Sequence, residues 1–341
     1  MSRLELCLLT LGLGGALGCS SHTLDLDHPA PSTPAPAVTR AGGDPAIVSE
    51  DGIDAVWVDD HRLYWLTGFQ SFQSCLKSDC AHTILSYAQR PAQKGGIQGV
   101  TISNSVYWAV DYSLVFSCPT SGCSSTPTTV TDDPSLSIPI FSHGDDFYWC
   151  SDLDLYRCPA TGCDDSNLVT VPDVTTLRMI FDATHAYWID PVGIRSVPLD
   201  LSEPPSEQTP PSQNGLEMTS LATAQGYLYW TMDTRIVRSP IVHGGAMEPT
   251  EVIRSDAPIG DLAINGSTMF WLEDNAIHAC PLLGCERSTQ LTPATVGPQN
   301  TLNGSTRFAV DADNVYWLQA GEGSTPTSGP TRGTVIRRTP R

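Results

Sequence analysis

The chain has 341 residues, of which 40% are hydrophobic, and its 37 acidic residues outnumber its 18 basic ones, giving a net charge of -19. A nucleic-acid partner bound through a basic surface is therefore not expected. Full disorder is not expected either, because the chain contains 8 Trp, 10 Tyr and 8 Phe, and the length allows a sizeable core.

The first residues predict export. Residues 6–17 form an apolar run that is too short for a membrane span, which needs about 20 residues, but has the length of a signal-peptide core. The run ends in Ala16-Leu17-Gly18-Cys19, which resembles the lipobox of bacterial lipoproteins, although Ala and Leu are swapped relative to the usual order. We therefore predict a signal peptide over 1–18 and lipid attachment at Cys19. An ordinary secretory signal cut nearby is the alternative.

A segment without apolar periodicity follows over residues 19–45. It is rich in Pro, Ala, Ser and Thr, and such a composition is typical of a solvated, partly extended tether. Ser20, directly after the cysteine, resembles the residue found in lipoproteins sorted to the outer membrane. The predicted location is the bacterial cell envelope, as an outer-membrane lipoprotein that faces the periplasm or the cell exterior.

An aromatic–Trp dipeptide recurs seven times in the remaining chain. The seven Trp are 39 to 46 residues apart, and they are Trp65, Trp108, Trp149, Trp188, Trp230, Trp271 and Trp317. An apolar run and a polar turn precede most of these pairs, and two further β-prone stretches follow. Four short strands in about 42 residues are the signature of one β-propeller blade.

The sequence thus predicts an all-β fold, a seven-bladed β-propeller of four-stranded antiparallel blades over residues 46–341. After Trp317 only one more strand fits, so the seventh blade lacks its outer strand. Residues 46–51 resemble residues 251–256, the outer strand of an earlier repeat. We expect this N-terminal strand to complete the last blade and close the ring, which protects an open edge. Each Trp is expected to pack against the next blade.

Acidic residues follow most of the aromatic–Trp pairs by two or three positions, as at Asp111, Asp190 and Asp233. With these pairs, residues 46–341 resemble the YWTD-type and TolB-like propellers. The resemblance implies the propeller architecture and leaves the function open. The chain departs from YWTD propellers in having seven repeats rather than six and no regular Thr-Asp after each Trp.

Four cysteine pairs share one spacing and one place, the turn from the third to the fourth strand. They are Cys75/Cys80, Cys118/Cys123, Cys158/Cys163 and Cys280/Cys285. Strands that face each other across so short a turn bring Cβ atoms into disulfide range, and an exported protein permits the bond. Four hairpin disulfides are predicted, with metal or redox chemistry as the alternative. Cys150 has no partner and is expected to be a buried small side chain or a reactive thiol.

The loops between second and third strands are expected to emerge on the same face as the crossings between blades. Acidic and aromatic residues in these loops form the candidate binding face: Asp111, Tyr112, Asp152, Asp154, Asp190, Asp233, Glu273 and Asp274. The crossings add further carboxylates, among them Asp261. A concentrated negative field attracts cations or a basic partner, and calcium is the candidate ion. The alternative is a solvated acidic rim without a ligand.

No sequence motif of a common catalytic site is present. The first hypothesis is a non-catalytic binding or scaffold module on the bacterial cell envelope, a monomer held to the membrane by its lipid anchor. Its ligand would be a protein, a peptide or a glycan at the propeller face. The second hypothesis is a metal-dependent propeller enzyme, a hydrolase, lactonase or lyase, whose site lies at the acidic channel mouth.

Overall fold

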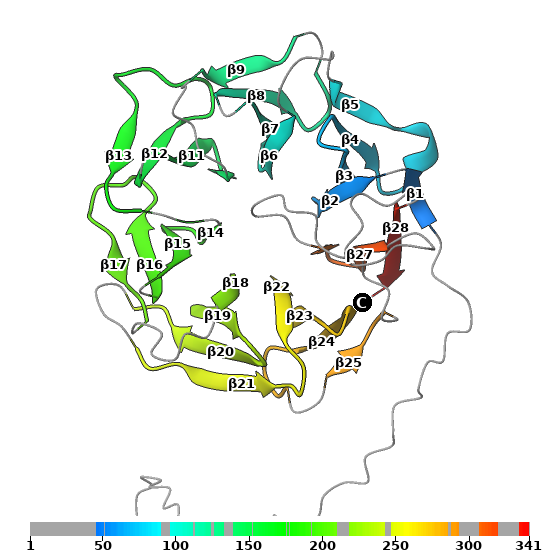
Figure 1. The fold of residues 1–341 in the computed structure, drawn as a ribbon, viewed down its shortest axis with the longest axis vertical. Helices are drawn as coiled ribbons and strands as arrows, with labels where there is room; N and C mark the ends of the chain where they lie inside the picture. Colours follow the sequence, from blue (N-terminus) through cyan, green and yellow to red (C-terminus); the bar gives the residue numbers. More distant parts are fainter. Residues whose placement is uncertain are drawn as a thin grey trace, which may run out of the picture. The chain divides into compact units, whose positions relative to one another are not determined.

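The computed structural model describes residues 46–50, 52–89, 96–111, 113–123, 126–132, 139–151, 153–174, 176, 178–191, 193–209, 218–242, 247–285, 288–292, 307–319 and 334–340. The predicted signal peptide, the tether and Cys19 lie outside these residues, as do Tyr112 and Asp152. The described residues form seven four-stranded antiparallel sheets arranged in a ring (Figure 1), which confirms the predicted fold. None of their helices has the length and apolar character that a bilayer span requires.

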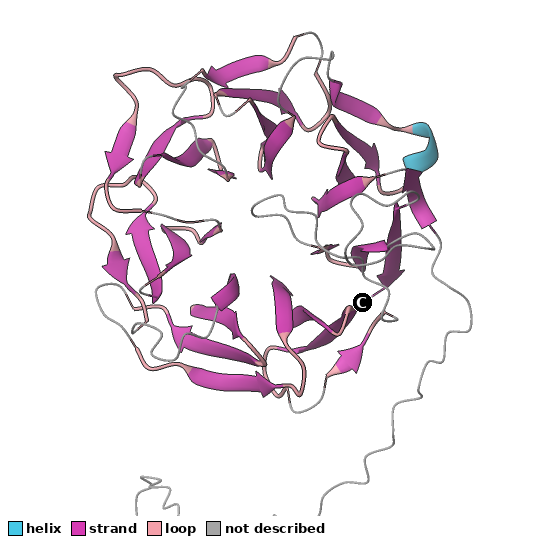
Figure 2. Cartoon of the chain, viewed as in Figure 1, coloured by secondary structure: helices cyan, strands magenta, loops and turns pink. Residues whose placement is uncertain are grey.

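Six blades are meanders whose strands run in chain order from the centre of the ring to its rim. Their strands are, in blade 1, β2 (Ile53–Val58), β3 (Arg62–Thr67), β4 (Ser71–Leu76) and β5 (Leu85–Gln89); in blade 2, β6 (Ile97–Ile102), β7 (Ser105–Val110), β8 (Leu114–Pro119) and β9 (Thr128–Thr131); in blade 3, β10 (Ile140–His143), β11 (Asp146–Ser151), β12 (Asp154–Pro159) and β13 (Val169–Val171); in blade 4, β14 (Met179–Phe181), β15 (His185–Asp190), β16 (Gly193–Pro198) and β17 (Ser206–Glu207); in blade 5, β18 (Met218–Ala224), β19 (Tyr227–Met232), β20 (Arg235–Pro240) and β21 (Thr250–Arg254); and in blade 6, β22 (Ile259–Asn265), β23 (Thr268–Glu273), β24 (Ala276–Pro281) and β25 (Thr289–Gln290). The short 3-10 helix η1 (Cys80–His82) at the edge of blade 1 is the helical element visible in Figure 2.

Blade 7 joins the two ends of the described chain. Its inner strands are β26 (Phe308–Val310), β27 (Asn314–Gln319) and β28 (Thr334–Pro340), and its outermost strand is β1 (Ala46–Glu50), paired antiparallel with β28. The N-terminal strand therefore closes the ring, as predicted from its resemblance to an outer strand. Val48 of β1 is buried in the same apolar cluster as Trp65 of blade 1.

The aromatic–Trp pairs form the interfaces between blades. Successive side chains of a strand point to opposite faces, so the two aromatic rings of each pair enter different interfaces. Tyr148 of blade 3 packs in one cluster with Trp188 of blade 4, and Tyr187 of blade 4 packs with Trp230 of blade 5. Each Trp thus faces the preceding blade and the residue before it faces the next blade. The expected direction was wrong, because the strand's pleat decides which ring points forward.

Three blades share a turn that the sequence analysis did not single out. In each, an aspartate five residues before the tyrosine accepts a hydrogen bond from the tyrosine hydroxyl and from turn amides: Asp59 with Tyr64, Asp182 with Tyr187, and Asp311 with Tyr316. Burial of the Asp182 and Asp311 carboxyls would raise their pKa values, but these hydrogen bonds, together with one from Lys77 to Asp311, outweigh it and lower both. Part of the chain's acidity therefore stabilises its turns.

All four predicted hairpin disulfides are present. Their Cα–Cα distances are 4.8 Å for Cys75–Cys80, 5.2 Å for Cys118–Cys123, 5.5 Å for Cys158–Cys163 and 5.4 Å for Cys280–Cys285, all within the usual disulfide range. Each bond ties the end of a third strand to the turn that follows it. Closing so short a loop stabilises the fold by roughly 2 kcal/mol on the chain-entropy estimate.

Cys150 is the free cysteine among the described residues, and it is buried in the interface between blades 3 and 4. Burial raises the pKa of its thiol to about 11, so the reactive thiolate is scarce near neutral pH. In a chain that begins at Asp44, we expect no alkylation by iodoacetamide at pH 7.5 while the protein is folded. Unfolding in guanidinium should add one alkyl group, seen by intact mass. Two or more additions without reduction would contradict the disulfide assignment.

Candidate functional site

The second-to-third-strand turns and the crossings between blades lie on one face of the ring, which we call the crossing face. Backbone amides at three crossings donate to carbonyl oxygens of these turns: Ile97 N to Phe69 O at 2.7 Å, Val174 N to Leu153 O at 2.6 Å, and Ile259 N to Asp233 O at 2.7 Å. The expected juxtaposition of the two loop sets is therefore present in at least three blades.

Several predicted acidic residues on this face also have a backbone role. Asp111, Asp233 and Asp274 have φ values of 58°, 51° and 49°, in the left-handed region that a tight hairpin turn requires. Aspartate tolerates this conformation better than most residues. Their regular spacing after each Trp thus follows from turn geometry and is not by itself a sign of ligand binding.

The remaining predicted residues are not gathered into one site. Asp190 forms an ion pair with Arg195 at 3.4 Å, and Glu273 accepts hydrogen bonds from Ser255 and from the Trp271 indole at 2.9 Å. Asp154 begins β12 in another blade. Within the described part of the chain, no three His, Cys, Asp or Glu side chains are close enough to hold a metal ion. The calcium prediction therefore has no ligand set among these residues.

A pocket of about 440 Å³ opens on the crossing face at the inner ends of blades 4 to 7. Of the predicted acidic residues of the candidate face that the structure describes, Asp274 alone lines it. The pocket is lined by Arg178, Thr219, Pro258, Ile259, Gly260, Asp261, Leu272, Asp274, Asn275 and Arg307. Its size is that of a site for a small molecule or the end of a larger ligand.

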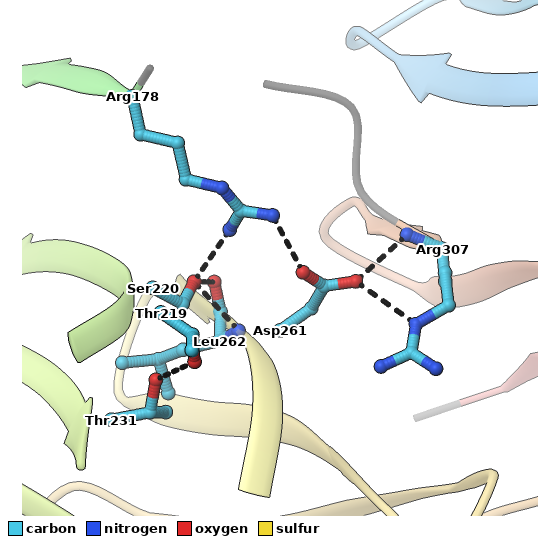
Figure 3. Close-up of polar contacts among 7 residues, drawn as sticks. All are labelled: Arg178, Thr219, Ser220, Thr231, Asp261, Leu262 and Arg307. Atoms are coloured by element: carbon cyan, nitrogen blue, oxygen red, sulfur yellow. Dashed lines mark hydrogen bonds and ion pairs between the residues drawn. The ribbon is translucent and has the colours of Figure 1, made fainter. Parts of the chain in front are cut away.

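A buried carboxylate bridges two arginines in this pocket (Figure 3). Arg178 donates from Nη2 to Asp261 Oδ1 at 2.8 Å and from Nη1 to Ser220 Oγ at 3.0 Å. Arg307 donates to Asp261 Oδ2 from its backbone N at 3.0 Å and from its Nε at 3.4 Å. We call Arg178, Ser220, Asp261 and Arg307 the bridge residues.

The repeat explains how residues from four blades meet. Each bridge residue directly precedes the inner-strand residue that pairs with its blade's Trp: Met179 with Trp188, Leu221 with Trp230, Leu262 with Trp271, and Phe308 with Trp317. The bridge residues therefore occupy one structural position, ten residues before the Trp, in four successive blades. In blades 1 to 3 the residue before the Trp's partner is Ala55, Gly99 and Pro139, although Gly99 stands nine rather than ten residues before Trp108. The inner ring is polar on one half and carries no charged side chain at this position on the other.

Gly260 allows Arg307 to lie close to the backbone of β22. A Cβ atom at this glycine would approach Arg307 Nη2 to 2.6 Å, which is far inside van der Waals contact. The backbone of Gly260 does not have the positive φ that favours glycine, so the missing side chain is what the site uses. The guanidinium is thus positioned by Asp261 and by the glycine surface.

Electrostatics favour the ionised form of the bridging carboxylate. Asp261 is 4% exposed, and this burial alone would raise its pKa. Arg178 and Arg307 outweigh burial and hold the pKa of the carboxyl below its usual value. One carboxylate faces two guanidinium groups, so the bridge has one excess positive charge, which Asp274 balances in the pocket lining.

Both arginines and the serine were not predicted as site residues from the sequence, and Asp261 was predicted only as part of a general acidic ring. The available signal was positional, because all four residues stand ten places before a Trp of the repeat. This spacing identifies one shared position on the inner strands. It does not show which side chains at that position are long enough to contact one another from blade to blade.

No protein-family model and no curated protein matches this sequence. Solved structures match at the level of fold. A chain of the mitotic checkpoint complex is 11% identical with a TM-score of 0.61, covering 94% of this chain and 99% of that one. YCF48 bound to D1 peptide is 12% identical with a TM-score of 0.60, covering 86% and 94%, and a streptogramin B lyase is 11% identical with a TM-score of 0.58, covering 86% and 94%. The comparisons show a β-propeller fold.

Proposed function

We propose that this chain is an exported, lipid-anchored binding module of the bacterial cell envelope that holds its ligand on the crossing face without catalysing a reaction. The observation that carries the proposal is the pocket, in whose lining Arg178, Asp261 and Arg307 occupy one repeat position in three blades, while Ser220, at the same position in a fourth blade, accepts a hydrogen bond from Arg178. Diversified residues at one position of a repeated scaffold, around a cavity, are typical of a binding site.

Several further features support this proposal. The apolar run over residues 6–17, the lipobox-like sequence ending at Cys19 and the tether over residues 19–45 fit export and anchoring as a monomeric lipoprotein. Four disulfides fit an oxidising compartment. YCF48, of similar fold, is bound to a peptide in its structure, so the architecture is compatible with a peptide ligand.

Site-specific photocrosslinking on intact cells tests this function. A benzoylphenylalanine at Asp274, on the pocket wall, should give a reproducible adduct with one partner. The same probe at Leu283, which is 74% exposed in a turn after a third strand, is the matched control and should give none. Equal labelling from both positions, or no adduct from position 274, would contradict binding at the crossing face.

Metal analysis of the purified propeller addresses the enzyme alternative. That alternative needs ligands that the described residues do not bring together, so we expect no ion to remain at a one-to-one ratio after dialysis against a weak chelator. An ion that remains, and whose removal lowers a measurable hydrolase, lactonase or lyase activity, would favour the enzyme instead.

A further inference from the structure

We propose that the pocket binds the carboxylate group of its ligand through the two Nη atoms of Arg307. The inference rests on the proposed binding function and specifies its ligand: a molecule with one carboxylate joined to a small apolar group, such as the C-terminus of a peptide or an organic acid.

The geometry of Arg307 leaves its outer edge available. Its backbone N and its Nε both donate to Asp261, and in Figure 3 the Nη atoms point away from that carboxylate. Among the described residues, neither Nη atom has a hydrogen-bond or ion-pair partner. The side chain is 20% exposed and lines the pocket. A planar guanidinium held in this way presents two parallel donors, which match a carboxylate.

The surroundings fix the guanidinium before a ligand arrives. Asp261 orients it through Nε, and Arg178 in turn orients Asp261 from the other oxygen at 2.8 Å. Gly260 provides the flat surface beneath Nη2. Little side-chain entropy then remains to be lost on binding, which favours affinity. Arg178 and Asp261 are positioning residues for Arg307.

The charges of the pocket lining favour a ligand group with a single negative charge. The pocket lining holds Arg178 and Arg307 against Asp261 and Asp274, so its formal charges cancel. A carboxylate adds one negative charge at the edge of one guanidinium, whereas a phosphate dianion would add two in a lining that already contains two carboxylates. Pro258, Ile259 and Leu272 supply an apolar wall for the carbon atoms next to the carboxylate.

Calorimetric titration with matched probes tests the proposal. The probes are acetyl-Ala-Ala-Ala with a free carboxylate, the same tripeptide with a C-terminal amide, benzoate and benzamide. The proteins are the wild-type propeller, Arg307→Gln, Gly260→Ala and Arg254→Gln. Arg254 lies on outer strand β21, is 61% exposed and pairs with Glu251, so this control removes the same charge outside the pocket.

The acids should bind the wild type at least about tenfold more tightly than their amides, since charge-assisted bidentate bonds are the strong ones. Arg307→Gln should lose this preference, and Arg254→Gln should keep it. Gly260→Ala retains every charge but displaces the guanidinium, and it should weaken acid binding about tenfold. This variant decides the question if Arg307→Gln does not fold. Binding of the tripeptide acid alone indicates a peptide terminus, and binding of both acids indicates that the carboxylate suffices.

Three results would overturn the inference: acid binding that is equal in the wild type and Gly260→Ala, a wild type that binds acids no better than amides, and a folded Arg307→Gln variant that keeps the preference for acids. Each of them would leave the proposed function standing if the crosslink from position 274 persists. Loss of that crosslink would instead contradict the function itself, so the two failures are distinguishable.

Discussion

Replacement of Asp261 by alanine is expected to lower the free energy of unfolding by about 3 kcal/mol. The carboxylate is buried and accepts from both arginines and from the Arg307 backbone amide. Its removal leaves two cations facing each other without a counter-charge, and breaking one side of a buried ion pair commonly costs about 3–5 kcal/mol. The lower end of this range of free energies applies because the side chains of Arg178 and Arg307 are partly exposed, at 21% and 20%.

Urea unfolding at pH 7 measures this effect. Asp60→Ala is the matched control, because Asp60 is an exposed turn residue, and its replacement should change stability by less than about 0.5 kcal/mol. Equal urea midpoints for the Asp261→Ala variant and the wild type would show that the bridge contributes nothing to stability.

The pH dependence of the same difference has a definite sign. The pKa of Asp261 is lowered in the folded protein, so its stabilising contribution is fully present above the unfolded pKa of about 3.9. It is lost as the pH falls through the lowered folded value. The gap between the wild type and Asp261→Ala should therefore narrow in acid below about pH 4. A gap that widens in acid would contradict the ionised bridge.

The fold was predictable from the sequence because its determinants repeat. Seven aromatic–Trp pairs, the paired cysteines and the resemblance between residues 46–51 and 251–256 each report one structural position several times. Comparison of the repeats also indicated that the last blade lacks its outer strand. The direction in which Trp188 packs was not predictable, because the dipeptide places one large ring on each face of the strand and spacing alone does not assign the faces.

The candidate site was not predictable for the opposite reason. Arg178, Ser220, Asp261 and Arg307 are of three residue types, at a position that holds Ala55, Gly99 and Pro139 in the other blades, so the features that all repeats share do not reveal them. The aspartates in the turns have two explanations from sequence, because a left-handed turn and a ligand site both favour Asp. The positive φ of Asp111 and Asp233 is sufficient to explain this residue type.

Removal of β1 is expected to open the ring. A chain that begins at Gly52 loses the strand that pairs with β28 and the buried side chain of Val48. Burial of a valine side chain alone is worth about 1.5–3 kcal/mol, so the free energy of unfolding should fall by roughly 3 kcal/mol. The exposed edge of β28 then offers unpaired backbone groups to other chains, which promotes association.

Two comparisons distinguish the specific loss of β1 from a general loss of stability. One uses a longer chain, and the other adds a peptide to the shorter chain. A chain that begins at Asp44 keeps β1 and is the matched control; it should elute as a single species and unfold at a higher urea concentration. Addition of a synthetic peptide of residues 44–51 to the shorter chain should restore the urea midpoint and suppress association, because the peptide takes the place of β1 beside β28. The ion pair between Lys77 and Asp311 at 2.7 Å also joins blades 1 and 7, and it remains in both chains. If the shorter chain matches the control in both measurements, this ion pair and the packing of Tyr316 against Trp65 close the ring without the strand.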